Sequence, residues 1–255
     1  MRRTVFGGVA LVVLTVAAYA GDEPWKTKPF DQWTDKDLNA VYQNSPWAKP
    51  NVQAMGAWRP MGSATMEGPT PGAIAGSSAD NSKTSQGTLG EQMGGAEKTK
   101  QAQAAAASQV YTILWWSSRT MREAAARQAV LRGSMSQEDA TKAIAQGLDE
   151  YEIMVQAQNM LIFQKRGEKS FQTASYHQMH KSKLKLQPSQ VTFRRGSDGE
   201  TVVGAVFHFP KKTAAGEPTI GTEEKSVDFF LQIGESRLLT EFDLRKMVDR
   251  QGADL

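Results

Sequence analysis

This sequence contains three histidines, whose imidazole side chains could bind a metal ion. His177 and His180 are three residues apart, so on a helix both imidazoles would share one face, and His208 could supply a third metal ligand. Zinc-protease motifs have a different spacing, with a glutamate beside the first histidine where this chain has Gln178. The lysines that follow, beginning with Lys181, would repel a cation. We therefore expect no metal site and no cofactor, with His177 and His180 partly exposed at a helix end.

Other catalytic patterns are weak. The sequence contains no cysteine, which excludes thiol nucleophiles, disulfides and cysteine-based metal sites. Ser117 and Ser118 stand at an expected strand-to-helix turn, but the glycines of a nucleophile elbow are missing and helix capping explains both serines. Paired carboxylates fall at expected helix ends or on polar faces, at Asp35/Asp37, Glu138/Asp139 and Asp149/Glu150. We expect a non-enzymatic interaction or structural module, and the alternative is an envelope-associated hydrolase that uses His177, His180 or His208.

The segment from Lys165 to Arg195 is strongly basic. It holds a single acid, Glu168, and eight basic residues: Lys165, Arg166, Lys169, Lys181, Lys183, Lys185, Arg194 and Arg195. The stretch Lys181 to Leu186 alternates like a strand, so its lysines would line one face. Lys181, Lys183, Lys185, Arg194 and Arg195 therefore form a candidate patch for an anionic partner, such as an envelope polymer, lipid headgroups or another envelope protein. The alternative is a solvated edge strand whose lysines block unwanted pairing.

The first residues predict export. Arg2 and Arg3 precede an apolar run from Val5 to Ala18, and Ala18-Tyr19-Ala20 offers small residues for cleavage. We expect 1–20 to be a signal peptide and the mature protein to be periplasmic or extracellular. The run is shorter than the roughly 20 apolar residues of a membrane span, so we expect no transmembrane anchor after cleavage. Without Arg2 and Arg3, 28 basic residues face 27 acidic ones, which argues against nucleic acid as a partner.

Residues 21–59 form a tryptophan-rich segment. Thr34 can cap a helix by accepting from the amide of Asp37, and Leu38 and Val41 follow at helical spacing. Trp33, Leu38, Val41 and Trp47 carry too much apolar area to stay in water, so we expect a docking segment that packs in a groove of the C-terminal domain or of a partner. Residues 60–100 are rich in Gly, Ser and Thr and predict a flexible linker.

Residues 101–255 predict an α+β domain, an antiparallel meander with helices inserted after its first strand. A strand is expected at 110–116, helices at 121–132 and 136–150, and a strand at 151–155. Thr120 with Glu123 resembles a capping box for the first of these helices, and Gly133 would end it. A short helix is expected at 168–178, followed by strands at 190–194, 201–209, 227–233 and 238–244.

Several stretches resemble a known group of proteins. They are Lys28-Pro29-Phe30-Asp31-Gln32-Trp33-Thr34-Asp35, Ser45-Pro46-Trp47-Ala48-Lys49, Trp115-Trp116-Ser117-Ser118-Arg119-Thr120-Met121-Arg122-Glu123-Ala124, Val206-Phe207-His208-Phe209-Pro210 and Phe242-Asp243-Leu244-Arg245-Lys246-Met247-Val248. The chain resembles uncharacterised exported bacterial proteins of the GWxTD-domain-containing type. The resemblance implies an extracytoplasmic protein without an assigned activity and transfers no site residues.

Overall fold

The computed structural model describes residues 23–53 and 109–255, and within them every strand pairs antiparallel. A five-stranded sheet has the order β1-β2-β3-β7-β6 and a four-stranded sheet the order β5-β4-β8-β9. The larger sheet consists of β1 (Ala48–Gln53), β2 (Val110–Trp115), β3 (Glu150–Ala157), β7 (Val202–Pro210) and β6 (Gln190–Arg195). The smaller consists of β5 (Lys185–Leu186), β4 (Ser175–Met179), β8 (Ser226–Ile233) and β9 (Ser236–Asp243). The α+β class is confirmed, and the meander is divided between two sheets.

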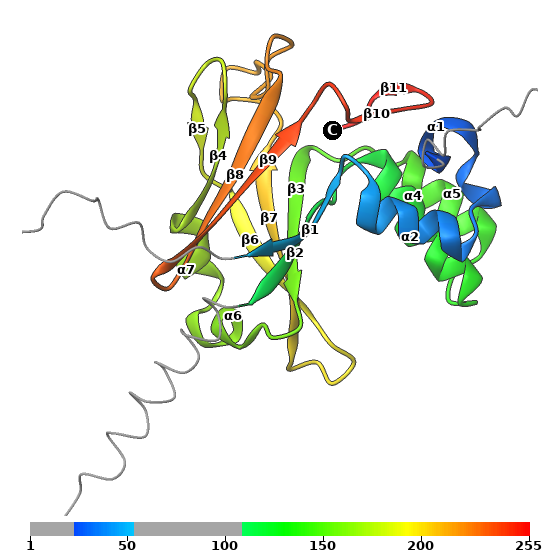
Figure 1. The fold of residues 1–255 in the computed structure, drawn as a ribbon, viewed down its shortest axis with the longest axis horizontal. Helices are drawn as coiled ribbons and strands as arrows, with labels where there is room; N and C mark the ends of the chain where they lie inside the picture. Colours follow the sequence, from blue (N-terminus) through cyan, green and yellow to red (C-terminus); the bar gives the residue numbers. More distant parts are fainter. Residues whose placement is uncertain (1–22, 54–108) are drawn as a thin grey trace, which may run out of the picture.

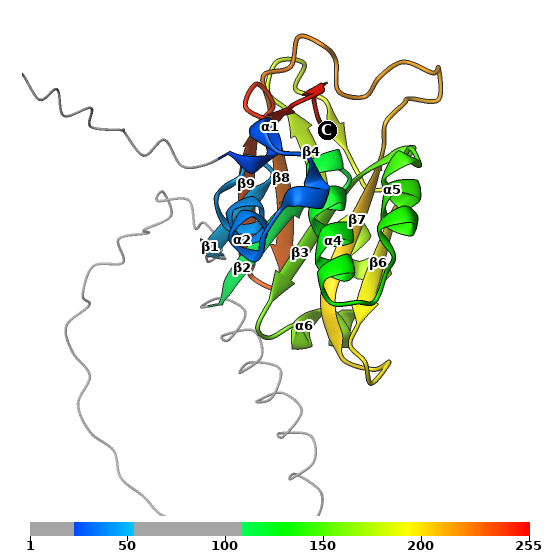
Figure 2. The ribbon, with the colours of Figure 1, turned by 90° about the vertical axis from the view of Figure 1, so that its right-hand side faces the viewer.

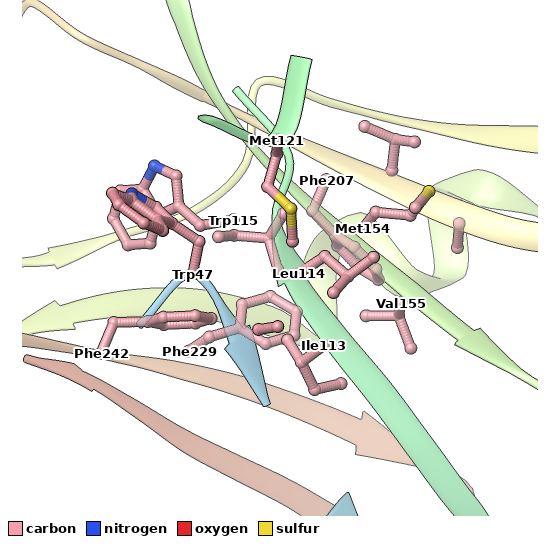
Figure 3. Close-up of a cluster of buried hydrophobic side chains, with 14 of the residues drawn as sticks. Trp47, Ile113, Leu114, Trp115, Met121, Met154, Val155, Phe207, Phe229 and Phe242 are labelled. Carbon is pink, nitrogen blue, oxygen red and sulfur yellow. The ribbon is translucent and has the colours of Figure 1, made fainter. Parts of the chain in front are cut away.

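The two sheets pack against each other around an aromatic core (Figure 1). Alternation along each strand sends every second side chain inward. Trp115 of β2 lies 5.1 Å from Phe242 of β9 between ring centroids, and Phe207 of β7 lies 5.2 Å from Phe229 of β8. Figure 3 shows Phe229 and Phe242 in one cluster with side chains of the larger sheet. The interior between the sheets is therefore filled by rings contributed from both.

Helices cover the outer face of the five-stranded sheet and close one end. In Figure 2, α2 (Asp35–Asn44) and α4 (Arg119–Leu131) lie in front of this sheet, and α5 (Gln137–Ala145) packs beside α4. The short helices are α1 (Pro24–Thr27), η1 (Phe30–Gln32), α6 (Leu161–Arg166) and α7 (Glu168–Thr173). The rings of Phe163 in α6 and Phe171 in α7 stack at 4.3 Å. A final hairpin of β10 (Val248–Asp249) and β11 (Gly252–Ala253) completes the chain. In the ranges described, no helix combines the length and apolar character needed to cross a bilayer.

The helix starts follow local capping rules, with one difference. At α2, Thr34 accepts from the amide of Asp37 as expected, and the Asp37 carboxylate also accepts from the amide of Thr34, which completes a capping box. At α4, Ser118 caps the helix by accepting from the amide of Met121, so the prediction that Thr120 is the cap is wrong. The amide of Thr120 donates instead to the carboxylate of Asp254, 134 residues away. A long-range partner therefore shifted the start of this helix.

The segment 23–53 belongs to the same core as the rest. β1 pairs with β2, with Ala48 opposite Leu114. Trp33, Val41 and Trp47 have no exposed surface, and the indole of Trp47 donates to the carbonyl of Asp254 at 2.7 Å. Of the two locations expected for this segment, the structure shows the one on its own domain. The expected signal peptide 1–20 and linker 60–100 lie outside the described residues.

The region 168–186 differs from expectation. The helix ends at Thr173, and His177 lies on strand β4 with no exposed surface, so the prediction of a partly exposed helical histidine is wrong for His177. The expected strand Lys181 to Leu186 is reduced to Lys185–Leu186, because Lys181 and Ser182 lie in a turn and Lys183 after it has a positive φ of 59°. Residues 168–178 fit both a helical and a strand pattern, and residues Ser175–Met179 form a strand because they pair with β8.

Candidate functional site

A pocket of about 390 Å³ lies between helices α2 and α4 and the outer face of the five-stranded sheet. Here it is called the sheet-face pocket. Its lining includes Tyr42 of α2, Gln128 of α4, Gln156 of β3, Arg194 of β6, Trp116, which follows β2, and Arg132, which follows α4. The volume falls within the range of small-molecule sites and suits one chemical group of a larger ligand.

The pocket is cationic. Arg132 and Arg194 contribute two guanidinium groups, and its lining, all of it within the described residues, includes no Asp or Glu. The guanidinium carbon of Arg194 lies 5.3 Å from the ring centroid of Trp116, a cation–π distance. One of its nitrogens is 3.4 Å from the sulfur of Met154. The indole therefore orients Arg194 without neutralising it, and the charge stays available to a ligand.

Tyr42 adds a neutral donor to the same pocket. Burial raises the pKa of Tyr42 to about 12, although the charges of Arg132 and Arg194 act in the opposite direction. The phenol therefore keeps its proton at every physiological pH. With the side-chain amides of Gln128 and Gln156, the lining offers hydrogen-bond donors beside the guanidinium groups of Arg132 and Arg194. Such a set fits a carboxylate or a similar oxyanion.

His208 lies on the same outer face of the sheet, on β7. Its Nε2 is 2.9 Å from the hydroxyl oxygen of Thr192 on β6. Its Nδ1 is 3.4 Å from a carboxylate oxygen of Glu150 and 3.6 Å from one of Glu152. The arrangement places a hydroxyl, an imidazole and a carboxylate in sequence, which is the order used by nucleophilic hydrolases.

The other predicted basic residues do not converge on the pocket. Lys181 pairs with Glu223 at 3.0 Å, and Lys185 lies over the ring of Tyr176 on the four-stranded sheet. Lys183 is exposed in the turn before β5. Arg195 follows Arg194 at a bulge and donates to the backbone carbonyl of Glu200. The candidate patch Lys181, Lys183, Lys185, Arg194 and Arg195 is thus divided between two sheets, and only Arg194 lines the pocket.

The three histidines are also separated. His177 is buried between the sheets, where its ring stacks on Phe209 at 3.7 Å. His180 follows β4 and pairs with Asp228 at 2.8 Å. His208 faces away from the core, toward the helical side. Within residues 23–53 and 109–255, no group of three His, Asp or Glu side chains could hold a metal ion.

The four residues expected to dock are held inside the chain itself. Trp33, Leu38, Val41 and Trp47 are each at most 3% exposed. A partner could reach them only after the fold opened. Leu38 and Val41 are the buried apolar residues of α2, so they hold this helix against the core and thereby position Tyr42, the residue after Val41.

Sequence reasoning missed Tyr42, Trp116 and Arg132 as site residues. They come from α2, the end of β2 and the end of α4, and nothing in their spacing along the chain brings them together. One weak signal existed, because Arg132 immediately precedes Gly133, which ends α4 with a φ of 69° and places the preceding side chain at a helix terminus.

Comparison with known proteins finds no relative. No protein family model matches the chain, no curated protein matches it, and no solved structure matches it.

Proposed function

We propose that this protein is an exported, non-enzymatic binding module whose sheet-face pocket takes a carboxylate group of an anionic envelope polymer. One observation carries the proposal: two guanidinium groups line a pocket that holds no carboxylate of its own among the described residues. Positive charge in a recess raises the local concentration of anions, and guanidinium groups there bind an anion more strongly than the same groups on an open surface. The signal-peptide pattern of residues 1–20 supports the extracytoplasmic location.

Binding of oligogalacturonate, a polymer of sugar carboxylates, tests the proposal. We expect Arg194→Gln and Arg132→Gln each to weaken binding about tenfold or more, since each removes a charge-assisted contact. Added salt should weaken the wild-type interaction as well. The measurement is titration calorimetry on the purified full chain, with a neutral glucan oligomer of equal length as the control ligand.

Arg195→Gln is the matched control variant. It removes the same charge from the neighbouring residue, whose guanidinium donates to Glu200 and does not line the pocket. We expect its affinity to stay within about twofold of wild type, because an exposed charge outside the pocket contributes little. An equal loss for Arg195→Gln and Arg194→Gln would reduce the interaction to general charge attraction and contradict the pocket.

A second candidate, an envelope-associated hydrolase, is favoured by the contact between Thr192 and His208. In that function His208 would take the proton from the hydroxyl of Thr192 while Glu150 orients the ring. Thr192→Val removes the nucleophile with little change in volume. Turnover of p-nitrophenyl acetate that is lost in Thr192→Val and in His208→Gln would support the hydrolase. Equal background rates in wild type and both variants would contradict the hydrolase and favour the binding module.

A further inference from the structure

A second pocket, of about 650 Å³, lies between η1, α4, the end of α5 and the turn that joins β10 to β11. Here it is called the α4–α5 pocket. Its walls include Phe30, Arg119, Glu123, Ile144 and Arg250. The stretch Lys28 to Asp35, which contains Phe30, and the stretch Trp115 to Ala124 both line this pocket, although 79 residues of chain separate them.

Two arginines hold the walls of this pocket in place. Arg119 donates from Nε and Nη2 to the carboxylate of Asp249, with both distances 2.7 Å. Arg122 donates from one nitrogen to the carbonyl oxygens of Ile144 and Gln146 at the end of α5, at 2.9 and 2.8 Å. These contacts join α4 to the C-terminal hairpin and to α5. The pocket therefore has a built frame.

Arg250 and Glu123 line the pocket and have no hydrogen-bond or ion-pair partner for their side chains within the described residues. Arg250 is exposed at the rim, and its guanidinium forms no hydrogen bond or ion pair within the described residues. Glu123 is 8% exposed, and its carboxyl group likewise has no hydrogen bond or ion pair there. An unpaired carboxyl group that is nine-tenths buried is costly unless a ligand pairs with it or it takes up a proton.

The surroundings of Glu123 favour its protonated form. Burial raises the pKa of Glu123 to about 7, the carboxylates of Asp249 and Asp254 add to the rise, and Arg119 and Arg250 oppose it. Two further charged groups line the pocket, the carboxylate of Asp31 on η1 and the guanidinium of Arg122 on α4, and the residues by which α5 lines it are uncharged. Below pH 7 the carboxyl group of Glu123 is therefore mainly protonated and can donate a hydrogen bond to a ligand in the pocket.

We propose that the α4–α5 pocket binds a small organic carboxylate with an apolar body. The ligand's carboxylate accepts a hydrogen bond from the Glu123 carboxyl group and pairs with the guanidinium of Arg250, while Phe30 and Ile144 contact the apolar body. A cationic ligand would face the guanidinium groups of Arg119, Arg122 and Arg250. An uncharged apolar ligand would leave Glu123 buried and unpaired.

Phenylacetate is the probe, and the readout is the chemical-shift change of backbone amides of the purified full chain at pH 5.5 and pH 8.5. The probe is ionised at both pH values, so only the protein changes. About 3% of Glu123 is protonated at pH 8.5, and the apparent affinity should therefore fall about thirtyfold from pH 5.5. No binding at pH 5.5, or equal affinity at the two pH values, would overturn the proposal.

Variants separate Glu123 from general effects of pH. Glu123→Gln keeps a hydrogen-bond donor that does not ionise, so its affinity should equal that of wild type at pH 5.5 and stay unchanged at pH 8.5. Arg250→Gln should weaken binding about tenfold at both pH values. The control is Glu138→Gln on the exposed side of α5, where Glu138 pairs with Lys142, and it should behave as wild type. A thirtyfold pH effect that persists in Glu123→Gln would refute the role of Glu123.

Discussion

His177 is a titratable residue placed where it has to stay neutral. Its imidazole lies between Phe209 and Trp115, at centroid distances of 3.7 and 5.5 Å, and neither ring nitrogen has a hydrogen-bond partner within the described residues. Burial lowers the pKa of His177 to about 3 from its ordinary value of 6.5. A histidine in this state contributes to packing as an aromatic ring and takes no part in proton transfer near neutral pH.

The pKa of His177 predicts a pH-dependent stability. Between pH 6.5 and pH 3 the unfolded chain binds a proton that the folded chain does not, so acidification lowers the free energy of unfolding. The contribution is fully present above pH 6.5 and is lost as the pH falls toward 3. Relative to His177→Phe, the wild-type protein should lose about 1.4 kcal/mol per pH unit between pH 6 and pH 4.5.

Urea unfolding of both proteins at several pH values measures this difference. Glu123 acts in the opposite direction, because its raised pKa makes the folded chain the better proton binder between pH 4.5 and 7, but it is present in both proteins and cancels. Tyr176→Phe, on the opposite face of β4, is the control and should keep a constant difference from wild type. A constant difference for His177→Phe as well would show that His177 is accessible to protons in the fold.

At the scale of elements, the C-terminal hairpin fastens the start of α4. Asp254 accepts from the backbone amides of Arg119 and Thr120 at 2.6 and 2.9 Å, which satisfies two free donors at the positive end of the helix. Its carbonyl accepts from the indole of Trp47 at the start of β1. One residue therefore joins α4, the residue before β1 and the hairpin, and it orients the start of α4, whose first five residues include Arg119, Arg122 and Glu123.

Asp254→Ala should lower the free energy of unfolding by about 2 kcal/mol, because it leaves the buried amide of Thr120 and the part-buried amide of Arg119 without an acceptor. Asp254→Asn, which keeps one acceptor, should cost less. The matched control is Asp243→Ala, whose carboxylate pairs with the exposed Arg245 and should cost about 0.5 kcal/mol or less. Thermal and urea unfolding measure all three. A loss for Asp254→Ala no larger than that for Asp243→Ala would contradict the capping role.

At the scale of the whole molecule, residues 23–53 and 109–255 share one core. Trp25 and Trp47 meet edge to face at 5.8 Å, and Trp47 belongs to the same buried cluster as Trp115 and Phe242. β1 also provides one edge of the five-stranded sheet. Residues distant along the chain therefore fold together.

A chain of residues 101–255 alone should fail to fold. It would lose Trp33, Val41 and Trp47, all fully buried, and a single Trp to Ala change in a core costs about 3–5 kcal/mol, a large part of the stability of a domain. Circular dichroism and amide dispersion in NMR spectra measure the outcome. Cleavage of the full chain within 60–100 is the control and should leave the two pieces associated. Cooperative unfolding of 101–255 by itself would contradict the shared core.

The residue patterns of the sequence determined the local structure. Thr34 predicts the cap of α2 on the amide of Asp37, and the alternation from Val227 to Ile233 predicts β8, in which Phe229 is buried and Phe230 is half-buried. These predictions hold because capping and strand alternation depend on residues within a few positions of each other. The α+β class follows from the same signals.

Only the tertiary structure decided the positions that depend on distant partners. His177 became a buried strand residue because β4 pairs with β8, and Thr120 lost its capping role because Asp254 reaches the start of α4. The sheet-face pocket needs Tyr42, Trp116, Arg132 and Arg194 from four separate places in the chain, and the α4–α5 pocket needs Phe30, Glu123 and Arg250 from three. The spacing of these residues in the sequence does not predict that they line one pocket, because their proximity depends on how both sheets and the helices pack together.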